Sequence, residues 1–492
     1  MGRVIRQVLY IHPSKLPTGF RHDWLTPASP YVLAPLGITG MINLLRSHGV
    51  PVIGLNYAME VLMDEGFDLG RWLGAQERPG LVMIDLHWYE HSFGALDIAR
   101  LCKSLWPDVP ILLGGITASL FADEILRRFP EVDLILRGDP EGPILKLVES
   151  LMKGNRDLGE VPNVSFRVDG VVHHNPRTYV ARTPDLDKLD FVDLSFLQHG
   201  EQYYRYQSTD FNKLTGHWLC IARGCNFNCS FCGGSRAAQG IVAGRSGMVV
   251  RTPRRVAEEM EALYQAGVQQ VALSHDPAVL GRDYWRRLFD EMKARGLRIG
   301  LYVEHFQVPT PEYISAFAEA VVPSQSQVAL SPLSGHERVR LLNGKAFTNQ
   351  AFFAALAAFR TYRIPVFVYF SLNLPGEDEK TMEQTLAMAR RIHDQYPKRL
   401  LQMANMCHTI DPACPMSQNP GRYGIRVQMQ TFLDYYEYCR LTAVARPEAR
   451  TGLLRGFVEN PAGSRSIARM ADRWDALCAR LGEGCHRVPS AW

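Results

Sequence analysis

Apolar residues in the first 155 positions alternate between short continuous runs and helical spacing. The continuous runs predict strands at Val4–Ile11, Val52–Leu55, Leu81–Asp85, Ile111–Leu113 and Leu134–Leu136. The stretches between or after them carry apolar residues every three or four positions, which predicts helices at Ile38–Ser47, Gly94–Leu105, Ala118–Phe129 and Pro143–Met152. Continuous apolar strands separated by amphipathic helices are typical of a parallel sheet covered on both faces. We therefore predict a doubly wound, Rossmann-type α/β domain for residues 1–155.

Polar residues and glycines follow several of these predicted strands. In doubly wound sheets, ligands bind at the carboxyl ends of the strands. The candidates at those ends are Asp85, His87, Gly114, Gly115 and Gly138. Residues 156–215 contain turn signals such as Val161-Pro162 and Thr183-Pro184, so we interpret them as a linker.

A second alternation of strands and helices occupies residues 216–425. The predicted strands are Trp218–Ala222, Val271–Leu273, Arg298–Val303, Gln327–Leu330, Val366–Leu372 and Leu400–Asn405. A helix is predicted in each gap, as in a partial TIM-type (β/α)6 barrel. Because barrel active sites form at the carboxyl ends of strands, we expect catalytic roles for His275, Glu304 and His305 and cofactor contacts from Ser274 and Ser331. Residues 426–492 have helical spacing and are predicted to cap the barrel mouth.

Composition and charge narrow the partners and the compartment. Lys and Arg number 54 against 50 Asp and Glu, for a net charge of +4, so no basic surface indicates nucleic acid. No apolar run approaches the length of a membrane span, and the first residues lack the apolar stretch of a signal peptide. The 10 cysteines are irregularly spaced and do not suggest a disulfide framework. We expect a cytoplasmic protein with reduced thiols.

Three cysteines lie within eight residues of one another, at positions 225, 229 and 232. The gaps of three and then two residues allow Cys225, Cys229 and Cys232 to converge on one cubane iron–sulfur cluster. A cluster held by four cysteines has no open iron, whereas three would leave one iron free for a reactant. A closed zinc site needs four ligands, and no second Cys-x-x-Cys follows. Unconnected core thiols are a further alternative.

This motif, with Phe231 before the third cysteine and Gly233-Gly234 after it, resembles that of the radical S-adenosylmethionine (SAM) superfamily. The resemblance implies a [4Fe–4S] cluster whose open iron chelates SAM. It implies that one electron cleaves SAM to a 5′-deoxyadenosyl radical, so an external donor such as flavodoxin or ferredoxin is needed. It also implies that Phe231, Gly233 and Gly234 contact the cofactor.

Two later stretches resemble motifs of the cobalamin-binding radical SAM proteins. They are Leu330–Arg340 and Leu374-Pro-Gly-Glu377, and residues 409–424 resemble a subgroup that includes archaeal tetraether-lipid synthases. The resemblance implies cofactor contacts from Ser331, Ser334 and Arg340. Leu333 stands where many relatives have a glutamate that holds the SAM ribose, and leucine offers no hydrogen-bond acceptor.

The first domain resembles the cobalamin-binding domain that precedes many radical SAM barrels. The resemblance implies that its strand-end residues, listed above, contact the corrin. The motif Asp-x-His-x-x-Gly, which supplies a histidine to cobalt, is absent after the first strand, and Asp85-Leu86-His87 matches only its beginning. A scaffold without cofactor remains an alternative.

We predict a cobalamin-dependent radical SAM C-methyltransferase that acts on a small molecule, plausibly a specialised metabolite. One alternative is a radical SAM enzyme that couples or rearranges radicals without cobalamin. Another is a non-catalytic iron–sulfur partner protein. Two further pairs of cysteines are Cys407 with Cys414 and Cys478 with Cys485. They could ligate an auxiliary cluster, but we interpret them as ordinary thiols, because their six-residue gaps match no common ligand spacing.

Overall fold

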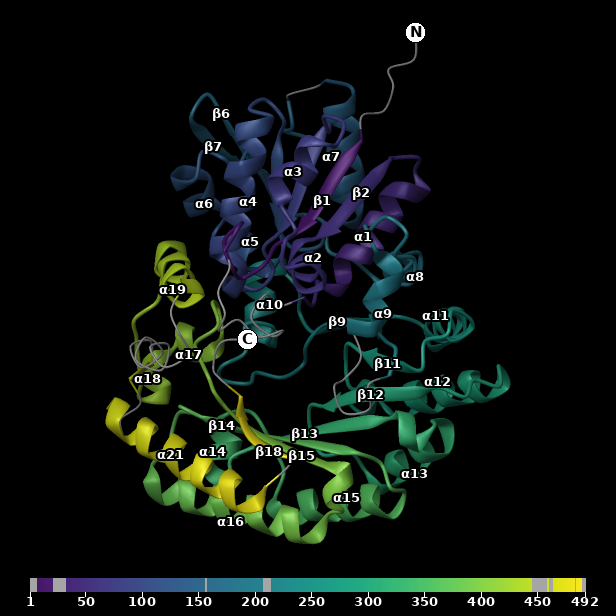
Figure 1. Ribbon diagram of the computed structural model, residues 1–492, viewed down its shortest axis with the longest axis vertical. Coiled ribbons are helices and arrows are strands. Elements are labelled where there is room, and N and C mark those ends of the chain that lie inside the picture. Colours follow the sequence, from purple (N-terminus) through teal and green to yellow (C-terminus); the bar gives the residue numbers. More distant parts are fainter. Residues whose placement is uncertain are drawn as a thin grey trace.

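The computed structural model contains two seven-stranded sheets, each built mainly of parallel strands (Figure 1). This arrangement confirms the predicted α/β class with two successive sheets. Among the described residues, no helix is long and apolar enough to cross a membrane. The structure describes residues 7–20, 32–154, 157–206, 214–444, 458–459, 463–482 and 484–488.

The first sheet has the strand order β2-β1-β3-β4-β5-β6-β7. Its parallel strands are β1 (Val8–His12), β2 (Val52–Asn56), β3 (Leu81–Asp85), β4 (Ile111–Gly114) and β5 (Leu134–Leu136). An antiparallel hairpin of β6 (Val164–Val168) and β7 (Val171–His174) extends the edge beyond β5. The beginning of the predicted linker therefore belongs to the first sheet.

Each face of this sheet packs against its own layer of helices, as expected for a doubly wound domain. The helices are α1 (Leu36–Ser47), α2 (Tyr57–Met63), α3 (Leu69–Gly74), α4 (Ser92–Leu105), α5 (Ile116–Leu120), α6 (Ala122–Arg128) and α7 (Glu141–Met152). Val8 and Tyr10 join the hydrophobic cluster of α1 and α7. The alternate residues Leu9 and Ile11 join the cluster that includes Leu96 of α4. The continuous apolar run of β1 is thus explained by burial on both sides.

The second sheet is a curved, open barrel in the order β18-β15-β14-β13-β12-β11-β8 (Figure 1). The strands are β8 (Gly216–Leu219), β11 (Gln270–Leu273), β12 (Gly300–His305), β13 (Gln327–Leu333), β14 (Val366–Leu372), β15 (Leu401–Cys407) and β18 (Cys485–Val488). The outer helices are α11 (Pro253–Gln265), α12 (Arg282–Ala294), α13 (Pro311–Ala320), α15 (Asn349–Thr361), α16 (Glu379–Gln395) and α21 (Gly463–Leu481). All six neighbouring pairs are parallel. The pattern predicted all of these strands except β18, whose four residues are too few to show a period.

The C-terminal segment divides between the two domains instead of forming one cap. Helix α19 (Phe432–Val444) packs under the first domain, where Phe432 and Tyr436 enter the cluster of Leu96 and Phe129. Helix α21 instead lies along α16 on the outside of the barrel, where Trp474 is fully buried (Figure 1). Both domains thus take core residues from the same late segment.

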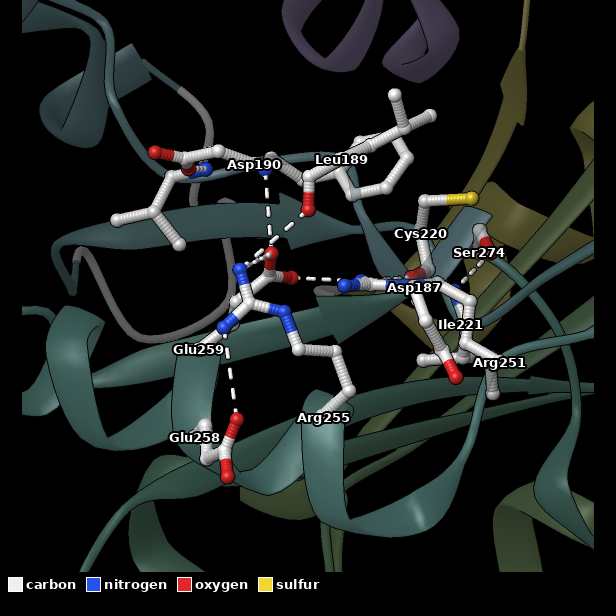
Figure 2. A network of polar contacts seen from close by, with 12 residues as sticks. Asp187, Leu189, Asp190, Cys220, Ile221, Arg251, Arg255, Glu258, Glu259 and Ser274 are labelled. Carbon is white, nitrogen blue, oxygen red and sulfur yellow. Dashed lines mark hydrogen bonds and ion pairs between the residues drawn. The ribbon is translucent and has the colours of Figure 1, made fainter. Parts of the chain in front are cut away.

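A buried ion pair attaches the linker to the first barrel strand (Figure 2). Arg251 is fully buried and donates to Glu259 at 2.6 Å and to the carbonyl oxygen of Cys220 at 2.8 Å. Its guanidinium lies 4.6 Å from the ring centroid of Phe191, whose backbone N–H donates to Glu259. Because a buried charge needs such partners, this contact fixes the linker against the start of the barrel.

Candidate functional site

The loop that carries the three cysteines lies between the two sheets, next to α10 (Arg236–Ala243). It follows β9 (Ala222–Gly224), which pairs with β10 (Met248–Val250). Gly224 has φ 89°, and a Cβ there would lie 2.4 Å from the carbonyl oxygen of Gly247, so this turn requires glycine. Ser235 closes the loop by capping α10, accepting from the N–H of Ala238 at 3.3 Å.

Backbone donors point at two of the three sulfurs. The N–H of Phe227 donates to Cys225 Sγ at 3.4 Å, and the N–H of Gly234 donates to Cys232 Sγ at 3.3 Å. Hydrogen bonds to cysteine sulfur are one of the means by which proteins tune iron–sulfur clusters. None of the three thiols is in a disulfide. The loop therefore has sulfur ligands with the backbone donors that suit a cluster.

The surroundings of these cysteines favour the neutral thiol. Bound iron would supply the positive charge that stabilises the thiolate. Burial raises the pKa of Cys225, and burial with the nearby Asp411 and Cys229 raises the pKa of Cys232. A metal-bound thiol is deprotonated outright. Among the described residues, no three His, Cys, Asp or Glu side chains converge as ligands of a single ion. A [4Fe–4S] cluster has a different requirement, because each thiolate binds a different iron and the sulfurs stand apart.

Segments from the far end of the barrel hold this loop in place. Gly344 has φ 93°, and a Cβ there would lie 2.7 Å from Cys229 Cα and 3.2 Å from its sulfur. The N–H of Gly233 donates to Asp411 Oδ2 at 2.9 Å. Burial and the carboxylate of Glu90, from the first domain, raise the pKa of Asp411 to about 7. The cysteine loop is thus packed between the barrel and the first domain.

Ion pairs connect both flanks of the loop to the end of β5. Arg223 contacts Asp139 at 3.1 Å and Glu141 at 2.7 Å, and Arg245 also pairs with Asp139. Both carboxylates and Arg245 are buried. The sequence pattern did not identify these ion pairs, although Asp139 lies only three residues after a predicted strand. The first domain therefore holds the cysteine loop through one arginine on each side of it.

His275 links the start of the cysteine loop to Ser274 at the end of β11. Its Nε2 lies 2.7 Å from the carbonyl oxygen of Gly224, and its Nδ1 lies 3.1 Å from Ser274 Oγ. Ser274 Oγ also accepts the N–H of Ile221 at 3.1 Å (Figure 2). Burial lowers the pKa of His275, so the neutral imidazole donates from Nε2. The arrangement assigns Ser274 and His275 to positioning the loop.

Glu304 points into the barrel together with aromatic residues. It accepts the hydroxyl hydrogen of Tyr302 at 2.9 Å. Its side chain is exposed at the end of β12, and desolvation by the surrounding protein raises the pKa of its carboxyl group. The neighbouring inward side chains are Trp218, Ala272, Ala329, Phe367 and Tyr369. The inner wall thus combines aromatic faces with one carboxyl group.

Phe231, from the cysteine loop, stacks on His408 with ring centroids 4.1 Å apart. His408 Nε2 lies 2.9 Å from Ser371 Oγ, and burial lowers the pKa of His408 to about 4, so its ring is neutral at pH 7. Lys345 lies close by and donates to the carbonyl oxygen of Phe306 at 2.8 Å. His408 follows the predicted strand Leu400–Asn405, where barrel site residues are expected, whereas Lys345 belongs to no spaced motif and was not predicted.

Other predicted site residues lie elsewhere. His305 faces the outer helices, packs on Tyr313 and Phe359, and pairs with Asp276 at 2.9 Å. Ser334 is buried against Thr385 at 3.2 Å. The structure therefore does not place these two side chains on the inner face of the barrel.

Arg340 is fully buried and has no carboxylate partner among the described residues. It donates to the carbonyl oxygens of Pro332, Ser334 and Phe347 at 2.8 to 3.1 Å, and burial lowers its pKa to about 10. Arg340 thus shapes the loop after β13. Ser331, on the inward face of this strand, is half-buried.

Leu333, at the end of β13, has φ 62°, which is costly for a bulky residue. It packs in a small cluster with Val339 and Leu374, on which Phe231 rests. The residue that departs from the family pattern therefore supports the aromatic residue of the cysteine motif.

The candidates of the first domain differ in how much open space they face. Asp85 is buried and accepts from Tyr10 at 2.7 Å and contacts His12 Nδ1 at 2.9 Å. Gly115 has φ 110°, and a Cβ there would lie 2.6 Å from His87 Cα, so packing alone explains this glycine. A Cβ on Gly114 would meet nothing closer than 3.9 Å.

His87 and Gly138 lie where the first domain meets the cysteine loop and its flanks. His87 is half-buried, and burial together with Arg223 lowers its pKa to about 4. Gly138 has φ 70°, and a Cβ there would lie 3.2 Å from Cα of Ala243 in α10. Of the predicted corrin contacts, Gly114 and His87 retain the most room for a ligand.

The later cysteines do not form one group. The sulfurs of Cys478 and Cys485 lie 2.7 Å apart. Cys414 is fully buried in a separate cluster with Ile410, whereas Cys407 borders the barrel core. The described residues therefore bring together one of the two predicted pairs.

Comparison with known proteins identifies the barrel. Residues 219–389 match the family described as the radical SAM superfamily. The chain is 23% identical over 310 residues to an uncharacterized methyltransferase of Pyrococcus horikoshii, covering 62% of each protein. It is 25% identical over 381 residues to the anaerobic magnesium-protoporphyrin IX monomethyl ester cyclase of Cereibacter sphaeroides, covering 74% of this chain and 56% of the relative. The chain spans less than two thirds of the length of both relatives.

A solved structure shares the two-sheet arrangement. It is the radical S-adenosylmethionine methyltransferase TsrM from Kitasatospora setae, with cobalamin and a [4Fe–4S] cluster bound. The TM-score is 0.63 at 16% identity, covering 84% of this chain and 74% of that chain. Residues 219–389 therefore match the radical SAM superfamily, and the chain shares its fold with a radical SAM methyltransferase solved with cobalamin bound.

Proposed function

We propose that the protein is a cobalamin-dependent radical SAM enzyme that methylates a carbon atom of a small molecule. One observation carries the proposal: the three-cysteine loop lies between the barrel and the strand ends of the first domain (Figure 1). Arg223 and Arg245 hold the loop to Asp139 of that domain. A loop in this place lets one enclosed space serve both domains.

Cys225, Cys229 and Cys232 are the residues that would hold a [4Fe–4S] cluster with one open iron. The open iron would bind SAM, with Phe231 and the Gly233-Gly234 backbone beside it. When bound, the cluster supplies an electron to SAM and cobalamin supplies the methyl group. The protein positions the loop through the hydrogen bond from His275 and the close packing of Gly344 on Cys229.

The corrin would lie where β4 ends. A Cβ at Gly114 would meet nothing closer than 3.9 Å, which supports close approach of a flat macrocycle to the backbone there. His87 is neutral and half-buried on the same side. The chain residues that would contact the corrin are Gly114, His87 and the loop of Gly138.

The substrate would bind on the inner face of the barrel. Tyr302, Tyr369 and Trp218 offer apolar faces, and Glu304 offers one hydrogen-bonding carboxyl group. Pockets of this kind bind small molecules through apolar walls and a few polar groups. Closure between the domains would exclude water that would otherwise quench reactive species.

The test is turnover of the reconstituted protein with SAM whose methyl group carries deuterium. We expect labelled product, 5′-deoxyadenosine from one SAM and S-adenosylhomocysteine from another. Product with a new carbon–carbon bond but no label and no S-adenosylhomocysteine would indicate a coupling or cyclising enzyme without methyl transfer. Absence of any reductive SAM cleavage would leave a non-catalytic iron–sulfur protein.

A further inference from the structure

A surface hollow of about 260 Å³ lies directly outside the cysteine loop. It is formed by Asn228 of the loop, Ala237 of α10, and Gly344 with Leu341 and Leu342 from the end of α14 (Glu337–Leu342). Arg422 of α18 (Pro420–Tyr423) contributes to the opposite wall. The hollow lies outside the barrel and is separate from the inward-facing group around Glu304.

The wall between this hollow and the cysteine loop is one residue thick at Gly344. A Cβ on Gly344 would lie 2.7 Å from Cys229 Cα and 3.2 Å from its sulfur, so backbone atoms of the wall touch a predicted cluster ligand. Tyr423, which also lines the hollow, interacts electrostatically with Cys229. Because electron tunnelling weakens steeply with distance, this is a short route from the surface to the cluster.

Apolar side chains are exposed at the rim. Leu341 is 64% exposed and Leu342 is 39% exposed. Single exposed leucines need no explanation, but adjacent ones beside a hollow indicate a contact surface. The exposure is greatest where the wall is thinnest, on the helix that leads into Gly344.

Arg422 is the charged side chain that lines the hollow, and two further arginines lie near its lining residues in the sequence. Arg236 directly precedes Ala237, and Arg338 lies one turn before Leu341 on α14. All three arginines are exposed, and none pairs with a carboxylate in the part of the chain that the structure describes. Glu337, the acidic residue of α14, is engaged at 2.6 Å by the N–H of Asn349.

We propose that this hollow is the docking site of a flavodoxin-type electron carrier. The inference rests on the proposed function, because it gives the [4Fe–4S] cluster its electron. Flavodoxins are acidic and expose an apolar edge of their flavin, which matches a basic rim around two leucines. One electron passes from the reduced flavin to the oxidised cluster; the carrier is oxidised by one electron, and no protein bond forms or breaks.

The expected complex is small and transient. Electron-transfer partners bury less surface than stable complexes, and complementary charge acts mainly on the rate of association. Salt screens such charges, so carrier-driven turnover should slow as ionic strength rises. A short-lived contact also suits a carrier that must leave after each electron.

The experiment compares two reductants on the same reconstituted protein. SAM cleavage is measured with a bacterial flavodoxin and its reductase, and again with dithionite, which is small and needs no docking surface. Leu341→Glu and Arg422→Glu should each lower the flavodoxin-driven rate at subsaturating carrier about tenfold, as loss of an important contact does. The dithionite-driven rate should stay at the wild-type value.

Leu441→Glu is the matched control, because Leu441 is 42% exposed on α19, a helix that contributes no residue to the hollow. It should leave both rates unchanged, and Arg422→Glu should weaken the salt dependence of the flavodoxin-driven rate. Wild-type flavodoxin-driven rates in both rim variants would overturn the proposal, as would an equal loss with both reductants. Failure of wild-type protein to cleave SAM with dithionite would instead count against the proposed function.

Discussion

The two sheets direct their strand ends toward the same central region, yet they use those ends differently (Figure 1). In the first sheet, His12 at the end of β1 and Asp85 at the end of β3 are buried and bound to each other at 2.9 Å. In the barrel, Glu304 at the end of β12 keeps its carboxyl group on open space. The first sheet uses these polar groups in its own packing, as the barrel does with His305 and Asp276, whereas Glu304 remains exposed.

The difference is clearest at the point where the strand order of the first sheet reverses, between β1 and β3, where ligands of such sheets usually bind. There Gly94 packs so closely on the carbonyl oxygen of Ser14 that a Cβ would lie 1.9 Å from it. The loop after β1 therefore packs tightly against α4 at this point, whereas a Cβ on Gly114 at the end of β4 would meet nothing closer than 3.9 Å. A shared fold thus does not fix which strand ends remain available.

Removing a predicted cluster ligand should have the largest effect. Cys225→Ala, Cys229→Ala or Cys232→Ala should abolish SAM cleavage with dithionite, because two thiolates cannot hold a cubane that already lacks its fourth cysteine. Iron and acid-labile sulfide should fall together with activity. Cys220→Ala is the control, since this buried thiol is in β-strand packing beside the loop and not in the motif. A full four-iron cluster in any of the three variants would refute the assignment.

Breaking the ion pairs between the domains should be the next largest change. Asp139→Asn leaves the buried guanidinium of Arg245 without its carboxylate and removes one partner of Arg223. Loss of one partner of a buried pair costs about 3–5 kcal/mol. Denaturant unfolding would measure this loss, with Asp123→Asn as the control because Asp123 pairs with Arg127 at the exposed surface. Equal small effects from both substitutions would mean that the domain contact is not a buried electrostatic one.

A pH titration should distinguish the buried histidines from exposed ones. Burial lowers the pKa of His217, at the linker contact of the barrel, from 6.5 to about 4. The unfolded state then binds the proton first, so stability is complete above pH 6.5 and is lost as pH falls toward 4, by about 3 kcal/mol.

Variants of one buried and one exposed histidine test this pH dependence. His217→Gln should make the pH dependence of the free energy of unfolding between pH 4 and 6.5 less steep, while His87 and His408 keep their share of it. His48→Gln, at an exposed position, should keep the wild-type slope. An unchanged slope in His217→Gln would show that other groups set the acid sensitivity.

The smallest effects are expected from substitutions at two adjacent glycines of the first sheet, which should differ in their effect on stability. Gly115→Ala should lower stability by about 1–3 kcal/mol, because it forces a side chain into φ 110° and against the backbone of His87. Gly114→Val should leave stability nearly unchanged and reduce cobalamin occupancy, which absorbance of the reconstituted protein would report. Full cobalamin binding by Gly114→Val would move the corrin away from the end of β4.

Local patterns in the sequence were enough to predict the two sheets and the cysteine loop. Each rests on neighbours in the chain: the continuous apolar run of β1, or the spacing of Cys225, Cys229 and Cys232. Contacts between segments that lie far apart in the sequence could not be predicted from local patterns. Asp139 and Arg223 are 84 positions apart, and Lys345 reaches the site only because its loop folds back under Phe306. His305 was misplaced for a smaller reason, since one step along a strand reverses the face.

The late segment that completes both cores also sets an order for biosynthesis. Phe432 and Tyr436 fill the core of the first domain, although its first strand begins at residue 8. Trp474 and Cys485 fill the core of the barrel, and β18 adds the strand beside β15. Domains usually fold as units while the ribosome is still at work. Here neither domain can reach its final packing until more than 430 residues have been translated, so the nascent chain would carry two unfinished cores at once.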